Sequence, residues 1–114
     1  MSDKIKIVKA QGVWTVRSGG AVLAESNQAL ELLENGYNPV IYFPRDDVGM
    51  AFLEPTDKAT TCPHKGQASY FSIMNRSATI ENGAWSYEDP IADVAEIKGY
   101  VAFYATDDVT VERI

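Results

Sequence analysis

Short runs rich in β-branched and aromatic residues recur along the chain, separated by glycine, proline and asparagine. The first clear pair is residues 13–18 and 21–24, with Gly19 and Gly20 between them. A two-residue glycine turn between two β-prone runs is typical of a hairpin, because such turns need positive φ. The pattern therefore predicts that the chain begins with two antiparallel strands.

Further apolar runs predict more strands. Residues 40–43 form a continuous apolar run between Pro39 and Pro44, which predicts a buried strand fixed at both ends. Asn82 and Gly83 separate two other runs and favour a second hairpin. The remaining expected strands cover residues 60–62, 68–73, 78–80, 84–87, 100–104 and 109–113.

A short helix is expected after the first hairpin. Ser26 or Asn27 can cap it, and Leu30 and Leu33 keep helical spacing. Gly36 follows where a left-handed terminal residue is favoured. We expect this helix to pack against the sheet.

A second short helix is expected over residues 91–97, because Pro90 suits a first helical turn. Residues 45–53 predict an irregular turn with one helical turn near its end.

About eight short strands, with turn signals roughly every 8–12 residues, do not alternate with helices as parallel βαβ units do. The fold class is therefore predicted to be mainly β and antiparallel, with residues 1–114 forming one domain.

Charge narrows the possible partners. Ten Lys and Arg stand against sixteen Asp and Glu, for a net charge of −6. Residues 77–114 carry two basic and eight acidic residues, which accounts for the whole net charge of −6. This balance argues against nucleic acid as a partner, since that binding depends on basic groups that neutralise phosphates. A small anionic ligand remains compatible, because the middle third of the chain is locally neutral.

Cysteine and histidine counts limit the chemistry further. One Cys and one His cannot form a disulfide framework or a four-ligand zinc site of thiolates and imidazoles. We therefore expect no metal and no cofactor. The sequence also contains neither the apolar run of a signal peptide nor about 20 apolar residues that would span a bilayer. A cytoplasmic location without membrane partners is the expectation.

Residues 60–66 form the densest polar segment and contain both Cys62 and His64. On an extended backbone these two side chains would share a face, with Lys65 on the other. A nearby cation favours the thiolate, so Cys62 is a candidate nucleophile with His64 as base. The alternatives are a buried, inert Cys62 with a hydrogen-bonded His64, or a binding role for His64 and Lys65. Lys65 and the backbone around Gly66 are candidates for holding an anion.

Arg45 follows the predicted buried strand and is flanked by Pro44, Asp46 and Asp47. A guanidinium there can clamp a carboxylate or phosphate, or it can form a surface ion pair that caps the turn. Adjacent aspartates seldom face one ion, so a metal role for this pair is not expected.

Trp85 and Tyr87 share a face of their predicted strand and are candidates for the core or a pocket wall. Glu88 and Asp89 suit the N-terminal end of the following helix. Glu88 is otherwise the best candidate for a general acid or base, provided that its surroundings raise its pKa.

Three segments together, residues 42–48, 62–70 and 84–90, closely resemble the family of domain of unknown function 427, also labelled nucleotidyltransferase-like. Residues 99–104 fit the same family, and the resemblance runs in order from about Val22 to Tyr104. The positions that match its motifs are Tyr42, Pro44, Arg45, Asp47, Cys62, His64, Lys65, Gly66, Tyr70, Trp85, Tyr87, Glu88 and Pro90.

The resemblance implies a small bacterial-type domain with a β-tent-like fold, similar to methionine sulfoxide reductase B. Those relatives bind zinc through two pairs of cysteines, and this chain has only Cys62, so that zinc site is absent. The nucleotidyltransferase label transfers no chemistry, because the Gly-Ser and paired-Asp pattern of such enzymes is missing.

Three polar, aromatic-rich motifs in one small fold suggest a shared pocket for a small anionic ligand. Its expected charged and aromatic members are Arg45, His64, Lys65, Tyr70, Trp85, Tyr87 and Glu88, and the further candidate ligand-binding residues are Tyr42, Asp47 and Gly66. The alternatives are an enzyme that uses Cys62 or His64 with Glu88, and an interaction domain that pairs through a strand edge, for example as a homodimer.

Overall fold

The computed structural model describes residues 5–114. Every sheet within this range is antiparallel. Residues 1–4, on which the expectation about the N-terminal sequence partly rests, lie outside this range. Within it the strands are β1 (Ile5–Lys9), β2 (Trp14–Ser18), β3 (Ala21–Ser26), β4 (Leu30–Glu34), β5 (Val40–Tyr42), β6 (Leu53–Cys62), β7 (Gly66–Met74), β8 (Thr79–Ser86), β9 (Val101–Phe103) and β10 (Thr110–Arg113). They form the sheets β1-β4-β5, β10-β2-β3 and β6-β7-β8-β9.

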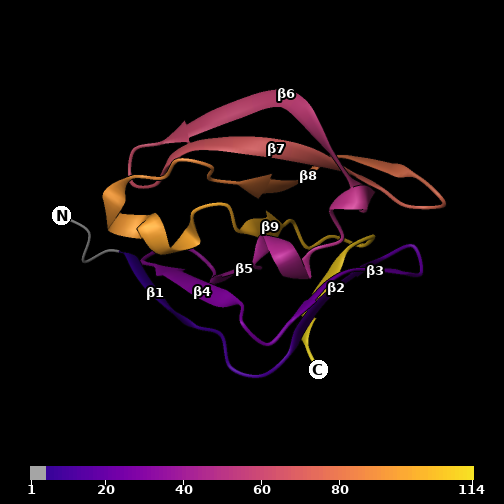
Figure 1. Ribbon diagram of the computed structural model, residues 1–114, viewed down its shortest axis with the longest axis horizontal. Helices are drawn as coiled ribbons and strands as arrows, with labels where there is room; N and C mark the ends of the chain where they lie inside the picture. The colour runs from indigo at the N-terminus through magenta and orange to yellow at the C-terminus, as the bar shows by residue number, and fades with distance from the viewer. Residues whose placement is uncertain (1–4) are drawn as a thin grey trace.

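Two of these sheets meet at β5 and β9. Phe43 and Val101 exchange backbone hydrogen bonds of 2.8 and 2.9 Å. In Figure 1, β5 and β9 accordingly lie between β1 and β4 on one side and β6, β7 and β8 on the other. This junction brings residues 30–42 and 62–87 to the two sides of one hollow.

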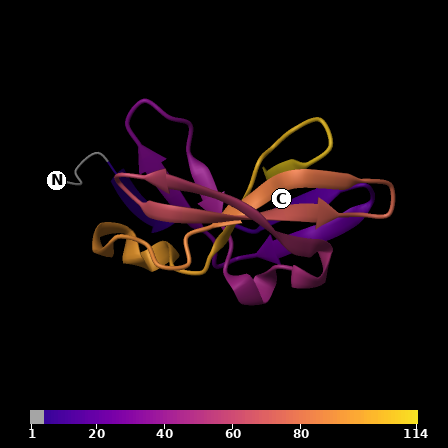
Figure 2. The same cartoon turned by 90° about the horizontal axis from the view of Figure 1, so that it is seen from above.

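The joined sheets bury apolar side chains on both faces. Side chains alternate along a strand, so Phe43 and Phe71 belong to a first core, whereas Tyr42 and Tyr70 belong to a second. The β2–β3 hairpin covers the first core, and the short 3-10 segment η3 (Ala92–Ile97) covers the second. These two covering segments lie at opposite ends of the molecule in Figures 1 and 2. A residue's place in the alternation therefore decides which core it faces.

Several expected elements are confirmed. The first hairpin is β2–β3, with Gly19 and Gly20 at φ 56° and 81° in its turn. The expected strands at 40–43, 68–73, 100–104 and 109–113 correspond to β5, β7, β9 and β10. The strand expected at 60–62 is the end of the much longer β6.

The helix expected after Ser26 is wrong, because residues 30–34 form strand β4. β4 pairs with β1 on one side and β5 on the other, so its backbone hydrogen bonds are made across strands. Ser26 does not cap a helix. Its hydroxyl accepts from the Gln28 backbone N–H at 2.9 Å and donates to Asp47 at 2.6 Å.

The hairpin expected at Asn82 and Gly83 is also wrong, because β8 runs through both residues. Asn82 has a positive φ of 54°, and the β7–β8 register shifts opposite this point. The pair therefore marks an irregularity within a strand. The actual β7–β8 turn follows Asn75, whose side chain accepts from the backbone N–H groups of Ser77 and Ala78, both at 2.8 Å.

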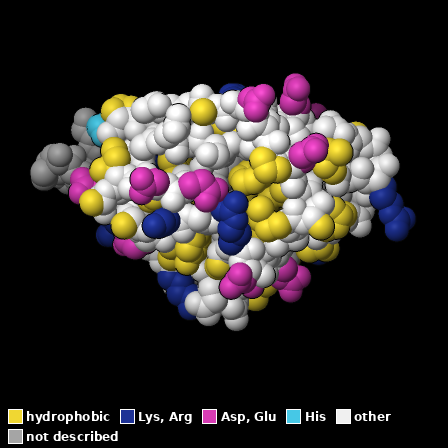
Figure 3. Space-filling model, turned by 45° about the horizontal axis from the view of Figure 1, so that its top comes forward, with side chains coloured by type: hydrophobic (Ala, Val, Ile, Leu, Met, Phe, Trp, Pro, Cys, Tyr) yellow, Lys and Arg dark blue, Asp and Glu magenta, His cyan; other side chains and the backbone are white. Residues whose placement is uncertain are grey.

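The helical turn expected near the end of residues 45–53 is the 3-10 segment η2 (Met50–Phe52). The helix expected over residues 91–97 is the 3-10 segment η3, which is interrupted by non-helical dihedral angles at Val94. A further 3-10 segment, η1 (Arg45–Asp47), was not expected. No helix among the described residues is long and apolar enough to cross a membrane. The acidic and basic side chains on the face shown in Figure 3 are interspersed.

Candidate functional site

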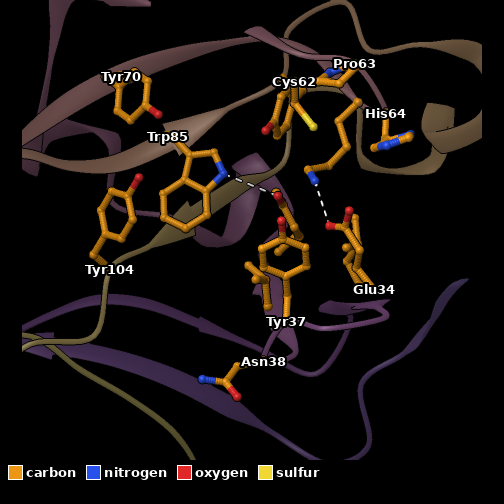
Figure 4. A pocket seen from close by; sticks show the side chains of 14 residues that line it. Glu34, Tyr37, Asn38, Cys62, Pro63, His64, Tyr70, Trp85 and Tyr104 are labelled. Carbon is orange, nitrogen blue, oxygen red and sulfur yellow. Dashed lines mark hydrogen bonds and ion pairs between the residues drawn. The ribbon is translucent and has the colours of Figure 1, made fainter. Parts of the chain in front are cut away.

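A cavity of about 460 Å³ lies between the joined sheets, on the side of the second core. We call it the tyrosine cavity, because five tyrosines and one tryptophan are among the fourteen residues that line it (Figure 4). These aromatic residues are Tyr37, Tyr42, Tyr70, Trp85, Tyr87 and Tyr104. Tyr42 comes from β5, Tyr70 from β7 and Trp85 from β8, so the joined sheets supply the wall.

Trp85 is held between two tyrosines. Its Nε1 donates to the Tyr42 hydroxyl at 3.3 Å, and the two rings meet edge to face with centroids 6.3 Å apart. On its other side, the Tyr104 ring lies 4.4 Å away with an interplanar angle of 39°. Contacts on two sides limit indole movement and pre-position its ring in the wall.

An ion pair forms the polar end of the cavity. Lys65 Nζ lies 3.0 Å from Glu34 Oε1, and the two side chains are only 13% and 14% exposed. Burial lowers the pKa of Lys65, but the hydrogen bond to Glu34 and the nearby Cys62 outweigh it, so the pKa is raised. Lys65 is therefore a protonated hydrogen-bond donor at neutral pH, and an ammonium in this state is not a nucleophile.

The turn after β6 decides which side chains enter the cavity. The sequence placed Cys62 and His64 on one face, with Lys65 opposite, but residues 63–65 form a turn in which the Lys65 N–H donates to the Cys62 carbonyl at 3.2 Å. Figure 4 accordingly shows the Cys62 sulfur directed into the cavity and His64 at its edge. His64 is exposed, and no hydrogen bond joins it to Cys62 among residues 5–114.

Gly66 supports this turn instead of lining the cavity. Its φ is +113°, and a Cβ there would lie 3.4–3.5 Å from the backbone of Asp89, Pro90 and Ile91. The Ile91 N–H donates to the Lys65 carbonyl at 2.9 Å. A Cβ at these distances would make only ordinary contacts with the 89–91 segment, so it is the positive φ of the turn that presents Lys65 that favours glycine here.

Arg45 and Glu88 do not line the cavity, and the expectation of one pocket for all the charged residues is corrected here. Arg45 Nη1 lies 3.0 Å from Glu88 Oε2 and 2.9 Å from the Gly99 carbonyl, and its guanidinium is 5.5 Å from the Phe71 ring centre. Phe71 belongs to the first core, across the sheet from Tyr70. Side-chain alternation therefore separates this pair from the cavity.

Asp47 also lies apart from the cavity, where it binds Ser26 and connects η1 to the end of β3. The candidates that do line it are Tyr42, Cys62, His64, Lys65, Tyr70, Trp85 and Tyr87. No group of three His, Cys, Asp or Glu side chains within residues 5–114 is placed to hold a metal ion.

Sequence reasoning missed Glu34, Tyr37 and Tyr104. Glu34 was assigned to a helix, which hid its strand alternation with Leu32. Tyr104 carried a usable signal, because it follows Ala102 by two positions and Ala102 faces the second core. Tyr37 lies in a turn, where no periodicity indicates a direction.

Three cavity hydroxyls are hard to ionise. Burial raises the pKa of Tyr87 to about 12, and nearby Cys62 adds to the effect. Burial and the neighbouring Tyr70 raise the pKa of Tyr104 to about 12. Burial also raises the pKa of Tyr42 above its usual value, partly offset by the Trp85 hydrogen bond. All three hydroxyls are neutral at pH 7.

These pKa values predict alkaline destabilisation. Tyrosines of the unfolded chain have a pKa of about 10. Between about pH 10 and pH 12 the folded chain therefore binds more protons than the unfolded chain. The free energy of unfolding should therefore fall as pH rises through this range. Urea denaturation at pH 8, 10 and 11, with tyrosinate absorbance followed to pH 12.5, measures both effects.

Tyr87→Phe should remove part of the late absorbance rise and weaken the pH dependence of stability. The matched control is Tyr37→Phe, at a side chain that is 72% exposed, and it should do neither. A single absorbance transition centred near pH 10 would contradict the prediction.

The comparison with family models agrees with the motifs that surround this cavity. No curated protein matches the chain. The model of a domain of unknown function (DUF427), labelled NTP_transf_9, matches residues 6–113. This range contains every residue of the tyrosine cavity, and the chain belongs to the DUF427 family.

Proposed function

We propose that the tyrosine cavity binds a small molecule with a flat ring and a polar edge, without forming a covalent bond. The observation that carries this proposal is the aromatic wall around Trp85 facing the nearly buried Lys65–Glu34 pair across an open hollow. A cavity volume of about 460 Å³ lies within the range of roughly 300–1,000 Å³ usual for ligand sites.

The ion pair supports recognition more than stability. Removing two charges from water is costly, and apolar replacements of buried pairs are often as stable. Lys65 offers three N–H donors and Glu34 uses one of them at 3.0 Å, so donors remain for a ligand. A ligand edge with an acceptor facing Lys65 and a donor facing Glu34 suits both groups.

The aromatic wall supports a ring in the ligand. Flat rings stack on indole and phenol faces in offset or edge-to-face geometry. Trp85 is only partly buried, so part of its surface faces the cavity. The acceptor group of the ligand is a carboxylate, phosphate or carbonyl; with Arg45 on the other face of the sheet, Lys65 is the cation that receives it.

An enzyme is the second candidate, because the Cys62 thiol lines the cavity close to Lys65. Nucleophilic use of this thiol needs a base in reach, and within residues 5–114 the exposed His64 forms no hydrogen bond with it. Non-covalent binding requires no such partner, which favours the binding proposal.

A β-tent-like arrangement of the sheets belongs to the same proposal. It is supported by the β5–β9 junction at Phe43 and Val101, where two antiparallel sheets meet along one edge and enclose the cavity.

The test uses Trp85 as its own reporter. Trp14→Phe leaves Trp85 as the only tryptophan, and its fluorescence is titrated with benzoate, adenosine and AMP, alongside thermal shift. We expect at least one probe to change the fluorescence and raise the melting temperature. Lys65→Gln should raise the Kd of that probe tenfold or more.

Two matched variants complete the test. Lys98→Gln, at an exposed lysine outside the cavity, should leave binding unchanged. Cys62→Ser should also retain binding, because the thiol forms no bond to the ligand. Binding that survives Lys65→Gln, or that is lost with Cys62→Ser, would contradict the proposal.

A further inference from the structure

A second hollow adjoins the tyrosine cavity. It is a groove of about 560 Å³ with walls that are mainly apolar, formed by Trp14, Pro39, Ile41, Phe103, Ala105 and Val111. Asn38, Val40, Trp85 and Tyr104 line both the groove and the tyrosine cavity. We call this second hollow the apolar groove. The shared residues make the two hollows neighbours across one wall.

We propose that the apolar groove holds an apolar extension of the same ligand, so that the ligand is an amphiphile. Its polar ring end lies in the tyrosine cavity near Lys65, and its apolar chain passes the Trp85–Tyr104 wall into the groove. This inference rests on the proposed function and adds the chemical class of the ligand to it.

The arrangement of charged and aromatic side chains along the cavity supports an amphiphilic ligand. Figure 4 places Trp85 and Tyr104 at the end of the cavity opposite His64. The charged pair therefore lies toward one end, and Trp85 and Tyr104, which also line the groove, lie toward the other. Tyr104 is 44% exposed, so part of its surface is open to an extended ligand.

The chemistry of the groove favours an alkyl or aryl chain as its occupant. Glu31 and Asn38 are the polar side chains among the residues that line it. A chain bound there is removed from water against Pro39, Ile41 and Phe103, and burial of each methylene is worth about fourfold in affinity. Because four residues line both hollows, one small ligand with a polar and an apolar part can contact both, which favours it over an unrelated partner.

The test is calorimetry of the unmodified chain with benzoate and its 4-methyl, 4-butyl, 4-hexyl and 4-octyl derivatives. These probes keep one carboxylate and one ring and differ only in chain length. We expect Kd to fall about two- to fourfold per methylene until the groove is filled. The gain in affinity should then level off.

Two variants separate groove binding from general hydrophobicity. Ala105→Glu puts a charge in the groove at an exposed position, so the fold should be retained, and it should abolish the chain-length gain without changing benzoate binding. Val111→Thr, a near-isosteric change, should reduce the gain. The control is Ala95→Glu, at an exposed alanine outside both hollows, which should change neither.

The outcomes distinguish the two proposals. Benzoate binding that depends on Lys65, with no chain-length gain, keeps the proposed function and overturns the amphiphile. A chain-length gain in affinity that persists in Ala105→Glu also overturns the amphiphile. A chain-length gain that is lost in Ala105→Glu, together with probe affinities that Lys65→Gln leaves unchanged, supports the groove and contradicts the polar site. No binding by any probe overturns both. A dimer by light scattering that Ala105→Glu dissociates would assign the groove to a second copy of the chain.

Discussion

Replacing Lys65 with methionine is expected to lower the free energy of unfolding by about 1–3 kcal/mol, because the Glu34 carboxylate stays behind without its partner. Glu34 is only 14% exposed and lies 3.0 Å from the ammonium that the change removes. Breaking a fully buried pair costs about 3–5 kcal/mol, and the open side of the cavity admits water that reduces this figure. Urea denaturation at pH 7 measures the loss.

The double variant Glu34→Gln with Lys65→Met tests the cause. Removing both charges leaves no unpaired carboxylate, so stability should return to within about 1 kcal/mol of the original chain. Ligand binding should remain lost, since the donor that receives the acceptor group is gone. Lys98→Met should change stability by less than about 0.5 kcal/mol. Equal instability of the single and double variants would show that the unpaired charge is not responsible.

Phe43→Ala should cause the largest loss of stability, about 3–5 kcal/mol. The Phe43 side chain is fully buried, at 0% exposure, and packs edge to face on Phe103 with ring centres 5.9 Å apart. Its backbone also makes the junction between β5 and β9. A cavity at this point weakens the contact between the two sheets that enclose the tyrosine cavity.

Urea denaturation and near-ultraviolet circular dichroism measure this effect. Phe43→Leu, which keeps most of the apolar volume, should cost about 1–1.5 kcal/mol. Tyr37→Ala, at a side chain 72% exposed, should cost less than about 0.5 kcal/mol. If Phe43→Ala lowers the free energy of unfolding by less than about 1 kcal/mol, the β5–β9 junction does not contribute to stability as predicted.

The sequence was a good guide where structure depends on neighbouring residues. The β2–β3 hairpin follows from Gly19 and Gly20, because only the local backbone decides which residues adopt positive φ. The run at residues 40–43 predicted a buried strand for the same kind of reason, as prolines limit both ends. The family motifs were also readable from the chain, and the family is confirmed.

Local patterns failed where a partner strand competes with them. Leu30 and Leu33 have helical spacing, but β1 pairs with residues 30–34 and β5 pairs with residues 30–32 on the other side. Asn82 and Gly83 look like a turn, yet β7 pairs with β8 on both sides of them. Propensity is a weak prior, and cross-strand pairing outweighed it in both places.

The sequence by itself determined the antiparallel β class, the family and most of the aromatic wall, because strand propensity and motif identity are properties of short segments. Only the tertiary structure decided which motif residues share a site. Arg45 lies three positions after Tyr42 but binds Glu88 on the other face, whereas Glu34 and Lys65, 31 positions apart, form an ion pair. Contacts across the β5–β9 junction depend on register and on which face each side chain takes, and neither is encoded in any one segment.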